Sequence, residues 1–539
     1  MTDIEIPTGR RAPQYRFFEM LPALLSYGMI IAPFALSFIN PLYAVIFIIV
    51  YIISFFLKSI AMSIRTVQGY NALQRAQRID WGERLADLEQ PEIALERLSG
   101  SKQAHARNLE QLLKTTHHAK PSDIYNAVII ATYNESIDVL EPTVQALIDN
   151  DYDTKRLILM IGYEGRDGAQ SKAACETLLA KYSDRFKYMM IVEHPSDIPH
   201  EVKGKGPNIT FAGRKLQQYV ENAGIDPEYV IVTTLDSDNR PHRNYFSYLT
   251  YEYILHPDAR HAAFQPMTLF LNNIWDVPAP MRVVATGNSF WNIVVSMRPH
   301  MLRNFASHSQ SLAALIDMDF WSVRTIVEDG HQFWRSYFRF DGNYSVTPLF
   351  IPIYQDAVLS DTYKRTLIAQ FIQVRRWSYG ASDVAYVASR LFRRDRTVPF
   401  WDGIAKFTRL VEGHVSWASS AIIILLGAFG PLLINPDAAR SVAAHQLPEV
   451  VSRIQQIAMI GLFTLIFISF KMLPPRPERY KRHRSIWLLL QWVLMPATSI
   501  IYGSAAALVS QTRLLLGRYF EVFDVTDKAV VKADGKRTL

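Results

Sequence analysis

Cysteine is almost absent from this sequence, since Cys175 is the only one in 539 residues. A single cysteine excludes an internal disulfide framework and any cysteine-based zinc or iron–sulfur site. Disulfide-poor chains are typical of reducing compartments. We therefore expect the soluble part of the chain to face the cytosol.

A basic stripe interleaved with aromatic residues is also missing, although the net charge is +7. The positive residues instead flank apolar segments: Arg10 and Arg16 precede the first one, and Lys471 and Arg476 follow a later one. Positive residues in such places are typical of the cytosolic ends of membrane spans. This distribution excludes nucleic acid as the expected partner and predicts membrane lipid instead.

Charged residues are absent between Glu19 and Lys58, and about 20 apolar residues are enough for a helix to cross a bilayer. Two spans fit this stretch, with a tight turn at Asn40-Pro41, because proline cannot continue a helix. A cleaved signal peptide fits less well, since the apolar stretch is too long. We predict an N-terminal transmembrane hairpin at residues 1–64, followed by a helical linker at residues 65–122.

Three more uncharged stretches lie near the C-terminus, at residues 415–436, 454–470 and 485–512. The last is too long for one upright crossing and too short for two, and it contains Pro496 and Gly503. Because Arg518 and Lys528 in the following tail favour the cytosolic side, a broken or re-entrant segment would reconcile length and charge. The predicted boundaries are residues 412–517 for the C-terminal transmembrane helices and residues 518–539 for the tail.

Aromatic, aliphatic and basic residues alternate just before the third apolar stretch, in residues 390–411. Such a composition suits a helix lying on the bilayer surface. A plain linker with some aromatic residues is the alternative. We therefore predict an amphipathic interface helix at this position.

Residues 123–389 contain short apolar strands separated by helical stretches, as a parallel α/β sheet requires. Helical periodicity is clearest at residues 137–150 and 171–182. Five strands are predicted, at Tyr125–Ala131, Leu157–Gly162, Tyr188–Val192, Tyr229–Thr234 and Ala262–Pro266. Because ligands of open α/β sheets bind beyond the carboxyl ends of the strands, the residues after each strand form the candidate site.

Acidic residues follow several of these strands: Glu135 after the first, Glu164 after the second, and Asp236 and Asp238 after the fourth. Carboxylates gathered at one edge repel each other unless a cation compensates them. Asp236 and Asp238, two residues apart, suit Mg²⁺ or Mn²⁺ shared with diphosphate oxygens. A capped turn is the alternative interpretation of this pair.

Four motifs in this order resemble the processive family 2 glycosyltransferases, which include the cellulose and hyaluronan synthases. The motifs are Ala131-Thr132-Tyr133-Asn134-Glu135, Asp236-Ser237-Asp238, Glu328-Asp329 and Gln373-Val374-Arg375-Arg376-Trp377. The resemblance implies a GT-A type nucleotide-sugar-binding domain inserted between transmembrane helices. It also implies an inverting enzyme that transfers sugar from a UDP-sugar to a growing polysaccharide and couples this to export.

The same resemblance implies a role for each motif residue. Asp329, beside Glu328, would be the general base, although both acids could also cap the helix that follows them. Arg376 would bind the donor diphosphate, with lipid headgroups as the alternative partner. The other donor-binding residues would be Thr132, Tyr133, Glu135, Glu164, Lys205 and Asp236; the acceptor-binding residues would be Gln373 and Trp377; the metal ligands would be Asp236 and Asp238.

Two matches are looser. The family shows paired aspartates after the second strand, whereas this chain has Tyr163-Glu164-Gly165-Arg166-Asp167, so Glu164 replaces them only as a candidate. Lys205 lies in a lysine- and glycine-containing loop that could also be an ordinary solvated loop.

Two alternative functions remain open at this stage. One is a single-transfer enzyme with a lipid acceptor, and the other is a transporter with a nucleotide-sensing domain. The transporter explains the spans but neither Asp329 nor the motif from Gln373 to Trp377. In every case we expect an inner-membrane protein whose middle domain faces the cytosol.

Overall fold

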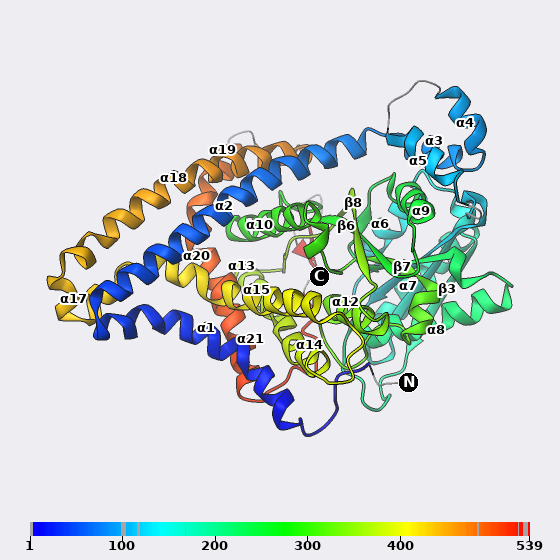
Figure 1. The fold of residues 1–539 in the computed structure, drawn as a ribbon. Helices are drawn as coiled ribbons and strands as arrows, with labels where there is room; N and C mark the ends of the chain where they lie inside the picture. The colour runs from blue at the N-terminus through cyan, green and yellow to red at the C-terminus, as the bar shows by residue number, and fades with distance from the viewer. Residues whose placement is uncertain are drawn as a thin grey trace.

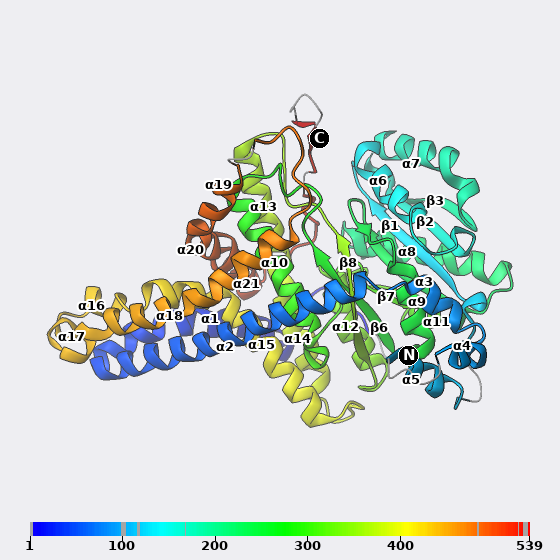
Figure 2. The same cartoon turned by 90° about the horizontal axis from the view of Figure 1, so that it is seen from above.

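The computed structural model describes residues 4–98, 104–115, 119–167, 169–481, 484–526, 528–531 and 537–538. A mixed α/β domain with an eight-stranded sheet occupies the middle of the chain. Long helices from both ends of the chain extend away from this domain (Figure 1). Figure 2 shows α1, α2 and α18 on one side of the molecule and the sheet on the other.

Four parallel strands form one half of the sheet, in the order β3-β2-β1-β4. Their bounds are Tyr188–His194 for β3, Leu157–Glu164 for β2, Tyr125–Thr132 for β1 and Val230–Asp236 for β4. Residues Ala127–Ile130 of β1 are fully buried, as a central strand covered on both faces requires. All four strands start at or next to the predicted positions.

The other half of the sheet is mixed, so the predicted parallel arrangement holds for only part of the α/β sheet. The short strand β7 (Ser309–Ser311) pairs antiparallel with both β4 and β6 (Ala262–Leu269). Then β8 (Ser345–Tyr354) pairs parallel with β6 and antiparallel with β5 (Arg240–Pro241). The polar sequence of β7 and the two prolines of β8 conceal both strands from hydrophobic patterning.

Helices cover the sheet, and two of them begin at the candidate site. Helix α8 (Lys205–Asn222) buries Ile209, Ala212, Leu216 and Val220, whose spacing places them on one face. Helix α12 (Glu328–Arg339) starts with the two acids predicted as catalytic. The other helices of this region are α6 (Ile137–Ile148), α7 (Ala169–Tyr182), α9 (Tyr245–Leu255), α10 (Ala279–Ser296), α11 (Leu312–Asp317), α13 (Tyr363–Ser378) and α14 (Asp383–Leu391).

Five helices in the described residues are long and apolar enough to cross a membrane. The first two, α1 (Pro13–Ile39) and α2 (Pro41–Gln77), form the predicted hairpin, with the Asn40 side chain accepting a hydrogen bond from the Leu42 amide at 2.9 Å. The next two are α15 (Phe400–Leu426) and α18 (Val442–Met472). Short helices complete the chain: α3 (Trp81–Asp87), α4 (Pro91–Arg97), α5 (Ala104–Leu112), α16 (Gly430–Ile434) and α17 (Pro436–Arg440).

Residues 400–411, expected as part of a separate surface helix, are instead the first turns of α15. No proline lies between Phe400 and Leu426, so the helix continues from the interface into the apolar stretch. Only residues 392–399 separate it from α14.

The last apolar segment is irregular, with α19 (Arg484–Leu490), α20 (Met495–Thr498), a π-helical stretch (Ser499–Ala505) and α21 (Ala506–Leu515). Near its start, Gln491 accepts a hydrogen bond from Arg282 of α10 at 2.7 Å. Near its end, Ser510 donates to the Arg375 carbonyl of α13 at 2.5 Å. Both ends of this segment therefore contact the α/β domain.

Candidate active site

The two acids after β4 each contact a lysine. Asp236 is the last residue of β4, and its Oδ1 lies 2.6 Å from the Lys205 Nζ at the start of α8. Asp238 Oδ1 lies 2.8 Å from the Nζ of Lys528, which belongs to the C-terminal tail. The compensating cations at this sheet edge are therefore provided by the chain itself.

Glu135 joins the ends of β1 and β4. Its carboxylate accepts hydrogen bonds from the Thr132 hydroxyl at 2.7 Å, the Tyr133 amide at 2.5 Å and the Ser237 hydroxyl at 2.7 Å. Lys528 approaches the same carboxylate at 3.3 Å. Glu135 thus holds two strand ends in register and shares its cation with Asp238.

The starts of α8 and α12 meet beside Asp236. A Cβ on Gly206 would lie 2.4 Å from the Ser322 carbonyl oxygen and 3.1 Å from the Glu328 Cβ, so only glycine permits this approach. Burial alone would lower the pKa of Lys205, but Asp236 and then Glu328 and Asp329 raise it, so both acids of α12 lie near this lysine. The close approach therefore brings the acids of α12 to the lysine that binds Asp236.

Three of these acids, Asp236, Glu328 and Asp329, differ in proton affinity because their surroundings differ. Burial alone would raise the pKa of Asp236, but Lys205 and then Lys528 hold it below its usual value. Burial, followed by the charge of Asp329, raises the pKa of Glu328 to about 8. Burial also raises the pKa of Asp329, although Lys205 opposes this. The acids of α12 therefore bind protons more tightly than the acid at the end of β4.

The motif from Gln373 to Trp377 lies in the last turns of α13. Arg376 interacts electrostatically with Asp236, Glu328 and Asp329, and burial lowers its pKa. Its guanidinium lies 3.7 Å from the centre of the Phe523 ring and donates to the Asp524 carbonyl at 2.5 Å.

The two predicted acceptor residues of this motif have ordinary packing partners. The Trp377 ring centre is 6.0 Å from that of Phe270, at the margin of an apolar cluster. The Gln373 side chain accepts a hydrogen bond from Gln370 at 3.1 Å. These contacts hold the two side chains in place.

A second polar cluster lies at the ends of β2 and β3, where the nucleotide base was expected. Glu164 accepts hydrogen bonds from Arg166 at 3.0 Å and Asn208 at 3.1 Å, and His194 Nδ1 lies 3.3 Å away. Arg166 in turn lies 4.9 Å from the centre of the Tyr133 ring. Burial would lower the pKa of His194, but Glu164 and Glu201 raise it to about 9, so this histidine is a cation at neutral pH.

Sequence reasoning missed the tail as part of the site. The Phe523 amide donates to the Lys203 carbonyl at 2.7 Å, and the Ala529 amide donates to the Leu359 carbonyl at 2.9 Å. These bonds lay the tail along the loops before α8 and after β8, which places Lys528 at the acids. The available signal was that uncompensated carboxylates need a cation, yet Lys528 was interpreted only as an indicator of topology.

Asp356 was missed as well. Its amide donates to Asp238 Oδ2 at 2.9 Å, and burial followed by the charge of Asp238 raises its pKa to about 7. It follows β8, a strand that the sequence did not reveal, and no spacing linked it to the other acids.

A metal ion was predicted at Asp236 and Asp238. Among the described residues, no group of three or more histidine, cysteine or acidic side chains could hold a metal by itself. Mg²⁺ is commonly bound by one or two carboxylates together with substrate phosphates. Two acids on one turn therefore fit a metal that arrives with a diphosphate. In this structure the positive charge next to Asp238 is that of Lys528.

The sequence matches no protein-family model and no curated protein. Among solved structures, it is similar to the mannosyltransferase PcManGT from Pyrobaculum calidifontis in complex with GDP-Man and Mn²⁺, with a TM-score of 0.40, 15% identity, and coverage of 84% of this chain and 99% of that one. It is also similar to residues 1–349 of TarS from S. aureus in complex with UDP-GlcNAc, with a TM-score of 0.36, 13% identity, and coverage of 77% and 96%. Both TM-scores are low, so neither similarity informs the function of this chain.

Proposed function

We propose that this chain is an inverting, metal-dependent family 2 glycosyltransferase of the GT-A type that uses a UDP-sugar to extend a polysaccharide. The observation that carries this proposal is one electrostatic cluster containing Lys205, Asp236, Asp329 and Arg376. These residues come from separate motifs of the sequence. They meet beside the carboxyl end of β4, where ligands of open α/β sheets bind.

Each residue of this cluster would have one task. Asp329 would remove the proton from the acceptor hydroxyl, since its raised pKa makes it a better base than an ordinary carboxylate. Lys205 and Arg376 would stabilise the charge that develops on the leaving diphosphate. A Mg²⁺ or Mn²⁺ ion held by Asp236 and Asp238 would supply further positive charge to the same diphosphate.

The remaining motif residues would bind the two substrates. Thr132, Tyr133 and Glu135 lie at the end of β1, where the donor ribose and base would bind, with Glu164 beside them. Trp377 would provide a flat apolar face for an acceptor sugar, with Gln373 as its polar neighbour. The α/β domain would face the cytosol of a bacterial inner membrane, and export would pass through the helices that extend from it.

A second candidate function is single transfer to a lipid acceptor. A cavity of about 660 Å³ lies among α1, α2 and α15 and is lined mainly by apolar side chains. Lys58 and Glu412 form an ion pair of 2.5 Å on its wall. A lipid tail with a polar head would match such a lining.

One experiment separates these functions. Purified full-length protein in detergent is incubated with Mg²⁺ or Mn²⁺ and a panel of UDP-sugars, and both UDP release and product size are measured. A ladder of long products supports the polymerising enzyme, whereas one lipid-linked product supports single transfer. Absence of UDP release with every donor would count against both.

A further inference from the structure

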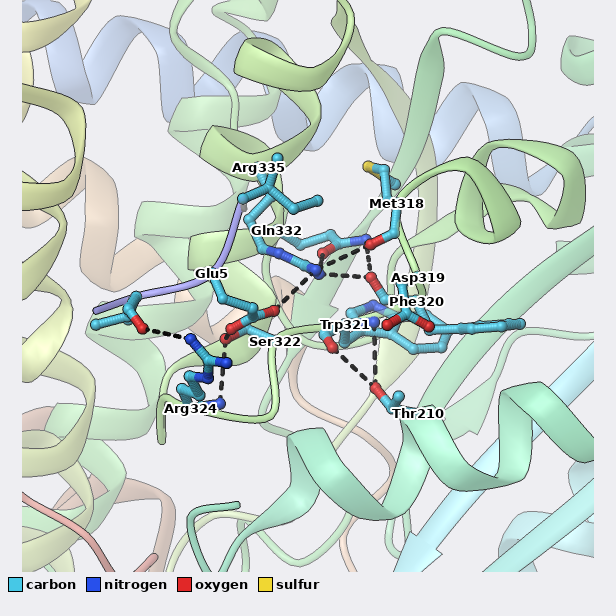
Figure 3. Close-up of polar contacts among 12 residues, drawn as sticks. Glu5, Thr210, Met318, Asp319, Phe320, Trp321, Ser322, Arg324, Gln332 and Arg335 are labelled. Atoms are coloured by element: carbon cyan, nitrogen blue, oxygen red, sulfur yellow. Dashed lines mark hydrogen bonds and ion pairs between the residues drawn. The ribbon is translucent and has the colours of Figure 1, made fainter. Parts of the chain in front are cut away.

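The first described residues of the chain lie against the helix that carries the proposed base. Figure 3 shows the Glu5 carboxylate directed at Arg335 of α12, with the two groups 2.9 Å apart. The other carboxylate oxygen accepts a hydrogen bond from the Ser322 hydroxyl at 2.6 Å. We call residues 4–6 the N-terminal strap.

Backbone contacts fix this strap on both sides of Glu5. The Ile4 carbonyl accepts a hydrogen bond from the Tyr386 hydroxyl of α14 at 2.8 Å, and the Ile6 carbonyl accepts one from Arg324 at 3.0 Å. The Ile6 side chain is buried in the same apolar cluster as Trp334 of α12. The strap is therefore packed into the domain and is more than a surface tail.

Arg335 is the group that the strap compensates, and its side chain is only 1% exposed. It donates to the Phe320 carbonyl at 2.5 Å and to the Met318 carbonyl at 2.9 Å. Asp319 and Phe320 both have positive φ, at 53° and 61°, a conformation that is costly for residues other than glycine. Arg335 thus holds a strained turn, and Glu5 provides a carboxylate for its buried charge.

The strained turn also contacts α8. The Thr210 hydroxyl donates to the Trp321 carbonyl at 3.0 Å (Figure 3). A Cβ on Gly213 would lie 2.6 Å from the Phe320 ring. The turn therefore lies between the helix that begins with Lys205 and the helix that begins with Glu328. Its contacts with Thr210 and Arg335 link these two helices.

Further along the chain, Arg16 and Glu19 at the start of α1 contact residues 514–519, where the C-terminal tail begins. Glu19, which is 3% exposed, accepts hydrogen bonds from Arg16 at 2.8 Å and from the Tyr519 hydroxyl at 2.8 Å. Arg16 also donates to the last carbonyls of α21, those of Leu514 and Leu515. Residues 4–19 therefore connect α12 with the point where the tail leaves the membrane helices.

We propose that Glu5 is a positioning residue that, through Arg335, holds the start of α12 against the start of α8. In this arrangement the strap keeps Asp329 beside Lys205 while making no contact with a substrate. The expected effect on turnover rests on the proposed function, whereas the effect of Glu5 on the position of α12 does not. A buried guanidinium that loses its carboxylate partner is strongly unfavourable, so the turn and α12 would shift to rehydrate it.

The test compares Glu5→Ala with Thr8→Ala, an exposed position three residues further along, in the full-length protein in detergent. Hydrogen exchange is measured by mass spectrometry on peptides covering residues 318–339 and, as an internal reference, β1 and β4. We expect faster exchange in residues 318–339 of Glu5→Ala alone, with the reference strands unchanged. Glu5→Gln, which can still accept from Ser322 but lacks the charge, should fall between the two.

The kinetic readout is the turnover number and the KM for the donor. Because a small displacement of a catalytic group is enough to slow turnover, we expect Glu5→Ala to lower kcat by about 10- to 100-fold with little change in KM. Unchanged exchange at residues 318–339 would overturn the proposal, as would loss of protection across the whole domain. If wild-type protein turned over no donor, the proposed function would fail, while the exchange data would still decide the role of Glu5.

Discussion

The acids at the end of β4 and the acids at the start of α12 lie in one site but are compensated in different ways. Asp236 and Asp238 each contact a lysine at less than 3 Å, and the pKa of Asp236 is held down. Glu328 and Asp329 lie beside each other at a buried helix start, and the pKa of both is raised. Their surroundings therefore shift the pKa values of these carboxyl groups in opposite directions.

This difference matches two kinds of chemical work. An acid that stays ionised provides a constant negative charge, which suits binding of a cation. An acid whose pKa approaches neutral pH can exchange a proton during a reaction. Under the proposed function, the first pair would bind a cation and the second pair would exchange a proton. We call them the cation-binding pair and the proton-exchanging pair, and the following predictions test that separation.

The largest effect is expected from removing the base. Asp329→Asn keeps the size of the side chain but cannot accept the acceptor's proton, so we expect kcat to fall by about 10²- to 10⁴-fold. Donor binding should be nearly unchanged, because the diphosphate contacts remain. Initial rates of UDP release and calorimetric titration with donor would measure the two quantities.

Asp341→Asn is the matched control for that variant, since it makes the same chemical change at an exposed position of the same domain. Its rate should equal that of the wild type. Undiminished turnover in Asp329→Asn would remove the base assignment and with it the separation of the two acid pairs.

The next effect concerns Arg376, which interacts electrostatically with acids of both pairs. Arg376→Lys keeps a positive charge but loses the planar fork that binds phosphate oxygens in pairs, so kcat/KM for the donor should drop by about 10²-fold. Arg365→Lys on the exposed face of the same helix provides the control, since Arg365 forms a surface ion pair with Asp361. Equal rates for both variants would show that Arg376 does not act on the diphosphate.

Much of this site was predictable because the strands that carry it have strong patterns. Four apolar strands, each followed by polar residues, predict that Glu135, Glu164 and Asp236 lie at one sheet edge. The hairpin turn at Asn40 was equally clear, because uncharged sequence on both sides of a proline leaves few alternatives.

The rest of the site depends on tertiary contacts that no local pattern encodes. Asp356 reaches Asp238 only because β8 pairs with β6 despite its two prolines. Lys528 reaches the same acid because the tail forms two isolated backbone bridges, Val522 with Lys203 and Lys528 with Leu359. Both partners are distant from the tail in the sequence. The approach of α8 to α12 depends on Gly206 having no Cβ, and a lone glycine predicts no particular partner.

A smaller effect should come from the lysine at the cation-binding pair. Lys528→Gln removes the charge that compensates Asp238 and Glu135, so a divalent metal would meet less electrostatic competition there. We expect the Mn²⁺ concentration that gives half-maximal activity to fall several-fold. Arg537→Gln, a similar loss of charge further along the tail, should leave that concentration unchanged. A higher Mn²⁺ requirement in Lys528→Gln would mean that this lysine assists the metal instead of competing with it.

The smallest expected effect is on stability, and it tests the proton-exchanging pair without any substrate. The pKa of Glu328 is raised from 4.5 to about 8, so the folded state binds a proton that the unfolded state has already lost. Stability from this group is therefore fully present below pH 4.5, decreases as the pH rises toward 8 and is level above that. Glu328→Gln, which mimics the protonated acid at every pH, should avoid this loss.

The melting temperature of Glu328→Gln should accordingly equal that of the wild type in acid and exceed it by a few degrees at pH 8, with the margin growing steadily between the two. Glu110→Gln, at an exposed position of α5, should show no such trend. A constant margin at every pH would mean that the glutamine repacks the helix start and that Glu328 is ionised in the folded protein. In that case Asp329 would have to work as a base beside a full negative charge on Glu328.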